Sequence, residues 1–469
     1  MKEFKNNAKS FIVKKILFIV RMTPFYINLG YAAKIEILSI IYNEKTGFND
    51  KLHNLETYQD LKSNYRKAIN GFEKSKLGKL LCKRARRTKR ERRKYAAKNN
   101  KVIFLTRSWH FFDPLVQFFE ENNMEFFKYD INEFDKVIFE KNRITNKSKY
   151  HREKAFKNLA ITFRKKQKYN EGNRCFTSDD FNIEYENSDI FFVDWLNHNT
   201  NWVLENVSDD KKIIVRIHSY EVLSFFPVTI NFGRIDGLIF ISEGIKDMFL
   251  ELWGWLLPND ILIDVLDNIR SKKRISLENE VSTKKRNKTI GMMQYADSVK
   301  GFRFAFDVFK GVYKVDPEFK LLLCGKTLAE IDSEENINIQ NEIKQLPEGV
   351  VQELGYIKDI DSFFRKVGYM LSTSEREGSH ESIIEGMAYG CVPIIRNWPI
   401  LAPFNGAKRA FPMCDIIDRV EEAVVQILST KSDYENISRE YKKESRVFFS
   451  DDIPNKYVEF IERVRRDEY

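Results

Sequence analysis

Residues 371–394 hold the side chains best suited to carry out chemistry. The stretch reads Leu-Ser-Thr-Ser-Glu-Arg-Glu-Gly-Ser-His-Glu-Ser-Ile-Ile-Glu-Gly-Met-Ala-Tyr-Gly-Cys-Val-Pro-Ile. Its pattern predicts a strand, then a polar loop with Gly378, then a short helix that begins near His380. Free N–H groups and the helix dipole at such a start attract anions. Glu377 and Glu385 flank it, where carboxylates can accept hydrogen bonds from sugar hydroxyls on either side of a diphosphate.

The spacing of these residues resembles a known signature. Glu377-x7-Glu385, followed by Met-Ala-Tyr-Gly and a Val-Pro-Ile strand, is similar to the motif of the retaining glycosyltransferases of family 4 (group 1), which have the GT-B fold. The resemblance implies that Glu377 contacts the transferred sugar and that Glu385 binds the ribose of the nucleotide. The donor-binding set that it implies comprises Glu385, Gly378 and the main-chain amides of Ser379, His380 and Glu381.

Two further residues extend the resemblance. Lys300 precedes a glycine at the start of a helix, as the family's lysine does, which implies that it stabilises the departing diphosphate. His218 follows a strand and is similar to the family histidine that reaches the donor sugar. The catalytic set implied is therefore Glu377, Lys300 and His218.

One position departs from the family pattern. The family usually has an arginine five residues before the lysine, and this chain has Tyr295 there. Either another cation, with Arg376 and Lys326 as candidates, supplies that charge, or the phosphates are bound differently. In the loop at 106–112, Arg107 and His110 are candidates to face the acceptor, and an ordinary structural role explains them equally well.

Two series of short apolar runs indicate the elements that would position these side chains. The first series comprises residues 102–105, 125–129, 189–193, 212–217, 237–241 and 261–266, and the second comprises residues 289–293, 320–324, 350–354, 367–372 and 392–395. Amphipathic, helix-length segments lie between several of them, which is typical of doubly wound parallel sheets. We therefore expect an α/β protein with two Rossmann-like lobes facing a cleft and a basic helical extension at the N-terminus.

These patterns divide the chain into four parts. We predict a basic helical extension at 1–100, an acceptor-side lobe at 101–275 and a donor-side lobe at 276–440. Residues 441–469 are expected to form a C-terminal helix that packs back on the first lobe. The polar stretch at 133–187 is interpreted as an elaboration outside the core.

The positive charge of the chain is concentrated at its beginning. The net charge is +10, but residues 1–100 hold 25 Lys and Arg against 8 Asp and Glu, so the other 369 residues carry −7. Ten of the sixteen residues in Lys83–Lys98 are basic, and a helix that carries them is expected to be unable to pack into a core on its own. The run is either a solvated linker helix or a segment attracted to anionic lipid or nucleic acid. The stretch Phe11–Arg21 fits an amphipathic helix on a membrane or a buried strand.

The five cysteines and the hydropathy pattern suggest a compartment. The cysteines are scattered with no CxxC spacing, which favours a reducing environment and argues against a zinc site. No apolar run approaches the roughly 20 residues that span a bilayer, and no signal-peptide cleavage site is visible. We expect a cytoplasmic protein, peripheral on the inner face of the membrane, where lipid-linked or polymer acceptors are built.

The resemblance implies transfer of a sugar from a UDP- or GDP-sugar to a hydroxyl acceptor, with retention, in polysaccharide or glycoconjugate synthesis. Lys300 and a helix start would take the place of a metal ion, and no cofactor is expected beyond the nucleotide sugar as co-substrate. Two alternatives stay open. A GT-B sugar-nucleotide epimerase would share the lobes, and a nucleic-acid-binding protein would use the basic segment, although the negative balance beyond residue 100 argues against the latter.

Overall fold

The computed structural model describes residues 76–92, 99–131, 179–223, 226–270 and 286–468, together with positions 73 and 97. These residues form two compact units. The N-terminal unit comprises the described residues up to Phe240, Met248–Asp264 and those from Tyr457 on, and the C-terminal unit comprises Ile241–Asp247 and Val265–Lys456. The segment Phe11–Arg21 lies outside the described residues.

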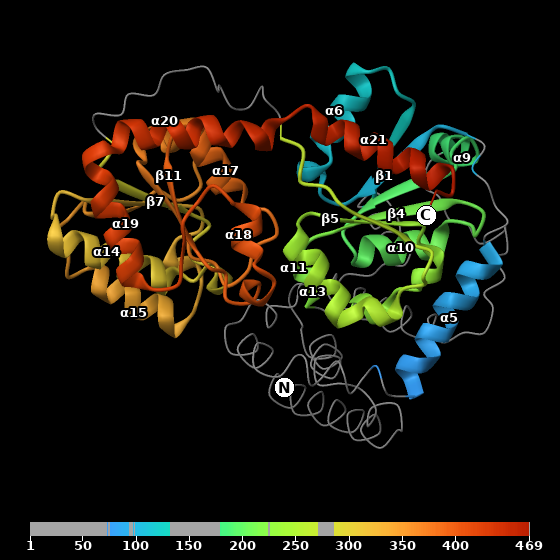
Figure 1. The fold of residues 1–469 in the computed structure, drawn as a ribbon, viewed down its shortest axis with the longest axis horizontal. Coiled ribbons are helices and arrows are strands. Elements are labelled where there is room, and N and C mark those ends of the chain that lie inside the picture. The colour runs from blue at the N-terminus through green and yellow to red at the C-terminus, as the bar shows by residue number, and fades with distance from the viewer. Residues whose placement is uncertain are drawn as a thin grey trace, which may run out of the picture. The chain divides into compact units, whose positions relative to one another are not determined.

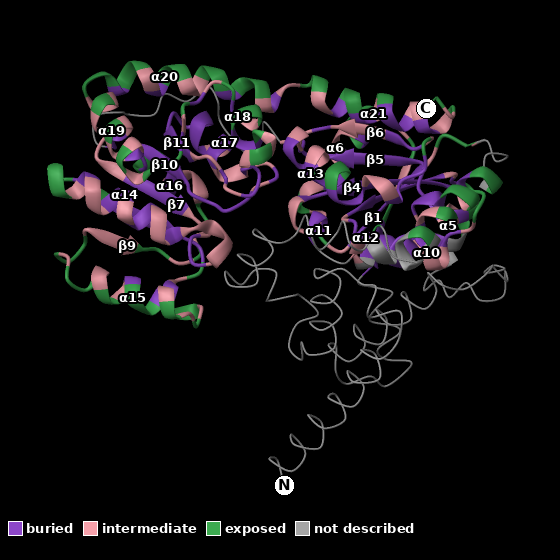
Figure 2. Cartoon of the chain, turned by 60° about the horizontal axis from the view of Figure 1, so that its bottom comes forward, coloured by how far each residue is buried: buried purple, intermediate pink, exposed green. Residues whose placement is uncertain are grey.

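The N-terminal unit is built on a six-stranded sheet in the order β2-β1-β3-β4-β5-β6 (Figure 1). Its strands are β1 (Val102–Thr106), β2 (Phe126–Asp130), β3 (Ile190–Asp194), β4 (Lys212–Ile217), β5 (Gly237–Phe240) and β6 (Leu262–Val265). The pairs from β2 through β5 are parallel. Every residue of β1, β3, β4 and β5 is buried, as expected for a parallel sheet covered on both faces (Figure 2). The strand order reverses between β1 and β3, and doubly wound sheets bind ligands at the carboxyl ends of strands beside such a switch point.

The helices of this region lie before, between and after the strands in the chain. They are α5 (Lys76–Arg92), α6 (Asp113–Glu121), α9 (Asp179–Glu186), α10 (His198–Asn206), α11 (Ser219–Val222), α12 (Phe226–Thr229), α13 (Glu243–Trp253) and α21 (Asp452–Arg465), with the 3-10 turns η1 (Trp109–Phe111), η3 (Phe232–Arg234) and η4 (Gly254–Leu256). Helix α9 corrects the expectation that residues 133–187 lie outside the core. Phe181 and Tyr185 are almost fully buried, and the Phe181 ring lies 4.1 Å from that of Tyr129 on β2.

Helix α5 corrects a second expectation, that a helix from the basic run cannot pack on its own. Leu81, Ala85 and Lys89 recur every four residues, so they share one helix face, and all three are buried. The Lys89 ammonium forms a buried ion pair with Asp236 at 2.9 Å. A Cβ placed on Gly233 of η3 would lie 2.1 Å from the carbonyl oxygen of Ala85, so the helix approaches η3 closely. A single paired lysine therefore lets a cationic helix dock on the N-terminal unit.

The C-terminal unit is built on a second six-stranded sheet in the order β12-β11-β10-β7-β8-β9. Its strands are β7 (Thr289–Met293), β8 (Lys320–Cys324), β9 (Val351–Glu353), β10 (Tyr369–Ser372), β11 (Val392–Arg396) and β12 (Ile416–Ile417), and all five pairings are parallel. If β7 is counted as the first strand of this unit, the order is 6-5-4-1-2-3. This is the strand order of dinucleotide-binding sheets, and its switch point lies between β7 and β10.

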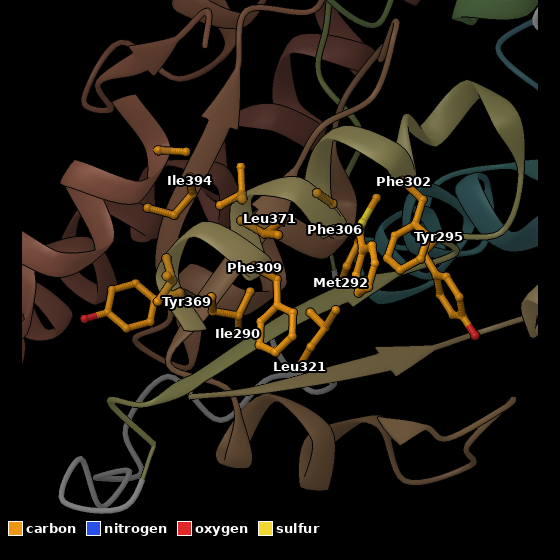
Figure 3. Close-up of a cluster of buried hydrophobic side chains, with 14 of the residues drawn as sticks. Ile290, Met292, Tyr295, Phe302, Phe306, Phe309, Leu321, Tyr369, Leu371 and Ile394 are labelled. Atoms are coloured by element: carbon orange, nitrogen blue, oxygen red, sulfur yellow. The ribbon is translucent and has the colours of Figure 1, made fainter. Parts of the chain in front are cut away.

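The helices of the C-terminal unit are α14 (Phe302–Val315), α15 (Glu334–Ile343), α16 (Ile360–Lys366), α17 (Glu381–Ala388), α18 (Gly406–Ala410), α19 (Val420–Thr430) and α20 (Tyr434–Glu444), with 3-10 turns η5 (Ser298–Lys300), η6 (Leu328–Glu330), η7 (Ala402–Phe404), η8 (Lys431–Asp433) and η9 (Ser445–Phe449). The core lies where α14 covers the sheet. Phe302, Phe306 and Phe309 of α14 meet Ile290 of β7 and Leu371 of β10 in one buried cluster (Figure 3). This packing fixes the carboxyl ends of β7 and β10 side by side.

The structure also bears on membrane-spanning helices and on the state of the cysteines. No helix among the described residues is both long enough and apolar enough to cross a membrane. Cys82, Cys324, Cys391 and Cys414 are not joined in disulfides. Cys175 lies outside the described residues.

Candidate donor-binding site in the C-terminal unit

The site is assembled by two loops that follow neighbouring strands. After β7 the chain turns through η5, which ends at Lys300, and after β10 it passes through residues 373–380 before α17 begins. The two loops are bonded to each other, because the Thr373 hydroxyl donates to the Lys300 carbonyl at 2.9 Å and the Glu375 amide donates to the Val299 carbonyl at 2.8 Å. Both loops lie at the switch point of the sheet, so the fold places them where a ligand is expected.

Gly301 makes the junction of these loops possible. Its φ is +62°, a left-handed conformation that favours glycine, and a Cβ at this position would lie 2.4 Å from the Thr373 carbonyl oxygen. The predicted Lys-Gly pair is therefore a close-packed turn that leads into α14. It directs the Lys300 side chain toward the loop after β10.

The Glu377 carboxylate is the centre of the site. The Lys300 ammonium lies 2.6 Å from its Oε1 atom, and the Ser374 hydroxyl donates to the same oxygen at 2.6 Å. The Nε2 atom of His380 lies 3.5 Å from that oxygen. The structure thus brings together Lys300, Glu377 and His380, three residues that the sequence pattern selected.

Opposing effects determine the charge of Glu377. Burial raises the pKa of this carboxyl, but the Lys300 ammonium, His380 and the hydrogen bonds from Lys300 and Ser374 outweigh it and lower the pKa to about 2. Glu377 is therefore ionised at neutral pH. It can accept hydrogen bonds, and it cannot act as an acid.

His380 is neutral at the same pH. Burial lowers the pKa of its imidazole to about 4, with Lys300 adding to the effect and Glu377 opposing it. The ring is 5% exposed, its Nδ1 atom lies 3.1 Å from the Ser382 hydroxyl, and it stacks on the buried Trp398. Lys300 is then the cation that contacts Glu377, because His380 carries no charge.

The start of α17 provides main-chain donors. His380 occupies the N-cap position and no side chain caps the helix. Among the described residues, the N–H groups of Gly378, Ser379 and His380 donate to no carbonyl or side chain, whereas the Glu381 N–H donates to the Ser379 carbonyl at 3.1 Å. Two of the three predicted amides, those of Ser379 and His380, can therefore serve an anion together with that of Gly378, whereas the predicted amide of Glu381 is engaged within the loop.

The side chains of this loop are held by a segment that sequence reasoning did not assign to the site. Arg270 donates to the Glu381 carboxylate at 2.7 Å and to the Ser379 hydroxyl at 2.5 Å, and Asn268 donates to Glu381 at 2.9 Å. The Ser379 hydroxyl in turn donates to Asp267 at 2.9 Å. Residues 267–270 thereby fix the position of the loop that presents the free amides.

The remaining candidates lie at different places. Glu385 is half-buried in α17, one turn after Glu381. Arg376 is buried in the loop after β10, and Lys326 is exposed after β8. Tyr295 is fully buried in the core, its ring 4.9 Å from that of Phe302 (Figure 3).

Tyr295 therefore does not substitute for the cation that the family usually has at its position. Its hydroxyl donates to Glu353 at 2.5 Å, so the polar end of the side chain is used within the fold. Burial, together with the Glu353 carboxylate, raises the pKa of Tyr295 well above its usual value.

No cluster of three or more His, Cys, Asp or Glu side chains with a metal-binding arrangement occurs in the part of the chain that the structure describes. The sequence does contain one Asp-x-Asp triplet, Asp359-Ile360-Asp361. Asp359 is the N-cap of α16 and accepts from the Ser362 amide at 3.1 Å, so its role in the structure is to cap a helix. Metal independence stays a prediction.

His218 lies in the N-terminal unit, directly after β4. Its Nε2 atom is 2.8 Å from Asp194 Oδ1, which also accepts from Arg216 at 2.8 Å. Burial raises the pKa of Asp194, but Arg216 and His218 outweigh it and lower the pKa to about 2. One nitrogen of His218 is thus oriented by a buried carboxylate, and its contact with a donor sugar stays a prediction.

The surroundings of His218 are strained and aromatic. Trp195, directly after β3, has a φ of +77°, which is rare for a bulky residue, and its ring stacks on His218 at 3.8 Å between centroids. Phe111 lies 5.1 Å from His218 on another side. Of the acceptor-side candidates, His110 is exposed beside Phe111 and Arg107 is half-buried. All of these follow β1, β3 or β4, at the carboxyl end of the N-terminal sheet.

Comparisons with known proteins agree with this geometry. Residues 274–448 match the sequence model of the family described as glycosyl transferases group 1. This match covers the strands and loops that hold Lys300, Glu377 and Glu385. A search of curated proteins returned no match.

Solved structures with the same fold are similar to this chain at low identity. A trehalose-6-phosphate synthase studied for glycosyl transfer with retention is 10% identical, with a TM-score of 0.50 over 77% of this chain and 99% of that one. The N-terminal domain of Candida albicans trehalose-6-phosphate phosphatase is 12% identical, with a TM-score of 0.50 over 79% of this chain and 100% of that one. These likenesses confirm the predicted pair of Rossmann-like lobes of the GT-B fold.

TarM is 16% identical, with a TM-score of 0.45 over 58% of this chain and 54% of TarM. The chain thus spans little more than half of the length of that protein.

Proposed function

We propose that this chain, whose residues 274–448 match the model of the group 1 glycosyl transferases, transfers a sugar from a nucleotide diphosphate sugar to a hydroxyl acceptor with retention of configuration. The observation that carries the proposal is the Lys300–Glu377 pair, followed directly in the chain by the amides of residues 378–380, which donate to no other described residue. A cation, a helix start and an ionised carboxylate at one switch point suit a sugar diphosphate, which has two phosphates and a hydroxylated ring.

The donor would be held by complementary charge and hydrogen bonds. The diphosphate would accept from the amides of residues 378–380 and from Lys300. Glu377 would accept from a hydroxyl of the sugar, because its low pKa keeps it ionised. Glu385 would accept from the ribose hydroxyls, as the family resemblance implies. We propose a UDP- or GDP-sugar as the donor.

During transfer, the bond between the sugar's anomeric carbon and the diphosphate oxygen breaks, and a bond from the acceptor oxygen to that carbon forms on the same face. The acceptor proton passes to the departing phosphate oxygen, so the leaving group is a protonated nucleoside diphosphate. Lys300 and the start of α17 stabilise the charge that grows on the phosphates. Burial lowers the pKa of His380, so Lys300 is the side chain that brings positive charge to Glu377 in this structure.

The N-terminal unit is proposed to bind the acceptor, a glycan or a lipid-linked or polymeric precursor of a polysaccharide or glycoconjugate. The aromatic rings around His218 suit the apolar faces of sugars. We propose that His218, held by Asp194, contacts the donor sugar from this unit and that the reaction needs neither a metal ion nor a cofactor. Activity in the presence of a chelator should match that in its absence if this is correct.

The test is a transfer assay with the full chain, using nucleotide sugars chosen by a thermal-shift screen. Lys300→Ala is expected to lower kcat by about 10²–10³-fold, because it removes a group that stabilises the leaving charge. Glu377→Ala should also lower turnover sharply. Lys344→Ala and Glu348→Ala, at exposed positions of the same unit, are the matched controls and should transfer sugar as the unaltered chain does.

Transfer by the Lys300 and Glu377 variants at the rate of the controls would refute the assignment. Incubation of the donor without an acceptor separates a transferase from an epimerase. An epimerase would convert the donor to a second sugar nucleotide, whereas the proposed enzyme would leave it intact or hydrolyse it slowly.

A further inference from the structure

Helix α5 presents a row of cations that the proposed transfer reaction does not use. Lys79, Lys83, Arg86 and Arg90 follow one another at spacings of four, three and four residues, which places them on one face of the helix. All four are exposed. Among the described residues, no carboxylate pairs with any of them.

The opposite face of α5 is fastened to the N-terminal unit. Leu81, Ala85 and the Lys89–Asp236 ion pair are buried there, and Asn231 donates to the Thr88 hydroxyl at 3.2 Å. The cation row therefore stands on a helix of fixed position. This distinguishes it from a solvated linker, in which the same charges would point in all directions.

A groove runs along this row, beside the turn η4. Its volume is about 670 Å³, and its lining includes Glu73, Lys79, Lys83, Arg86, Arg90 and Trp255. Trp255 is half-buried and donates its indole N–H to the Leu252 carbonyl at 2.8 Å, so the polar end of this side chain is used within the fold. Counting only described residues, the groove is lined by four cations that pair with no carboxylate, by an indole ring and by one carboxylate, that of Glu73.

We propose that this groove binds the phosphate groups of anionic lipids and holds the N-terminal unit on a membrane surface. The row spans about 16 Å, at 1.5 Å per residue, which matches a few adjacent head groups. Lysine and arginine beside anionic lipid each contribute to attraction at the surface, and tryptophan favours the boundary between head groups and acyl chains. The inference rests on these charges and this groove, and it holds whether or not the donor site works as proposed above.

The test measures binding of the full chain to vesicles of phosphatidylcholine with or without phosphatidylglycerol. The unaltered chain should bind the anionic vesicles and leave the neutral ones, and added salt should weaken the binding. The triple variant Lys83→Ala/Arg86→Ala/Arg90→Ala should bind about a hundredfold more weakly, given the contribution of each cation near such a surface. Its circular dichroism should be unchanged, because none of the three side chains forms an ion pair with another described residue.

A matched control removes the same charge elsewhere. Lys314→Ala/Lys344→Ala/Lys358→Ala takes three exposed lysines from the C-terminal unit and should leave vesicle binding within a few-fold of the unaltered chain. Equal loss in both triple variants would overturn the proposal, since net charge alone would explain it. Equal binding to neutral and anionic vesicles would also overturn it. Binding of an RNA duplex that depends on the α5 cations, without binding of anionic vesicles, would also overturn the proposal.

Discussion

The contact between Lys300 and Glu377 allows a quantitative test of the site. Glu377 has a pKa of about 2 in the folded chain against a usual value of 4.5, which corresponds to about 3 kcal/mol of stabilisation of the folded state. The side chains are 23% and 14% exposed, so solvent screens the pair only weakly. Lys300→Met keeps the length of the side chain and removes its charge. It should destabilise the C-terminal unit by up to about 3 kcal/mol at pH 7, because Lys300 makes the largest of the contributions that lower this pKa and Ser374 and His380 supply the rest.

The sign of the pH dependence follows from the direction of the shift. The folded-state pKa is lowered, so the stabilisation is complete above the usual value of 4.5 and is lost as the pH falls toward 2. The difference between the unaltered chain and Lys300→Met should therefore shrink from at most about 3 kcal/mol at pH 7 to at most about 1 kcal/mol near pH 3. Buried His380 adds a loss of its own between its usual pKa of 6.5 and about 4, and this loss should be smaller in Lys300→Met, because Lys300 contributes to the lowered pKa.

Urea unfolding at the two pH values measures these differences. Trp398, buried beside His380, reports on the C-terminal unit, because Trp109, Trp195, Trp202, Trp253 and Trp255 all lie in the other unit. Subtracting the tryptophan fluorescence of a Trp398→Phe protein leaves the signal of Trp398, which follows the unfolding of the C-terminal unit.

A double variant completes the cycle. Lys300→Met/Glu377→Gln should regain most of the lost stability, since no buried charge is then left without its partner. Equal stability of Lys300→Met and the unaltered chain at pH 7, or a double variant as unstable as Lys300→Met, would refute the reasoning.

Two further predictions concern stability. Gly301→Ala should destabilise the C-terminal unit by about 2 kcal/mol or more, because its left-handed φ is combined with a close approach to the Thr373 carbonyl. Gly349→Ala, also at positive φ but with open space around it, should cost only about 1 kcal/mol; equal urea midpoints for the two would contradict this. Asp194→Asn should cost about 3–5 kcal/mol by leaving buried Arg216 without its carboxylate, and an unchanged midpoint of the N-terminal unit would show that the ion pair is dispensable.

The strands were the most predictable part of the fold. Residues 212–217, 289–293 and 320–324 form β4, β7 and β8 with the predicted bounds. Each is a run of mostly apolar residues flanked by polar ones, and burial on both faces of a parallel sheet produces that pattern. Strand β12 has only two residues, Ile416 and Ile417, which are too few to show any periodicity.

The candidate site was predictable only where its residues are close in sequence. The loop, helix start and glutamates of 377–385 follow from local pattern and family resemblance. The bonds of Arg270 to Glu381 and Ser379 join residues more than 100 positions apart, and no local pattern encodes such a pairing. The bond of Asn268 to Glu381 likewise joins distant residues and depends on the folded loop.

Helix α5 shows a different limit. The count of charges in Lys83–Lys98 concealed the spacing of Leu81, Ala85 and Lys89, which was the signal for a docked face. Lysines are rarely buried, so a lysine in a basic run is normally taken to be solvated. The partner that makes burial of Lys89 possible is Asp236, which lies 147 positions away in the chain.

The buried pair of Lys89 with Asp236 has a practical consequence for shortened versions of the protein. A chain that starts at Lys101 would keep Asp236 but lose its counter-ion, and it would uncover the surface of η3 that Ala85 contacts. In such a fragment, the loss of the basic row could not be separated from the destabilisation caused by an unpaired Asp236. A useful cut therefore has to leave Lys76–Arg92 in place, and the row is better removed by point substitutions than by deletion.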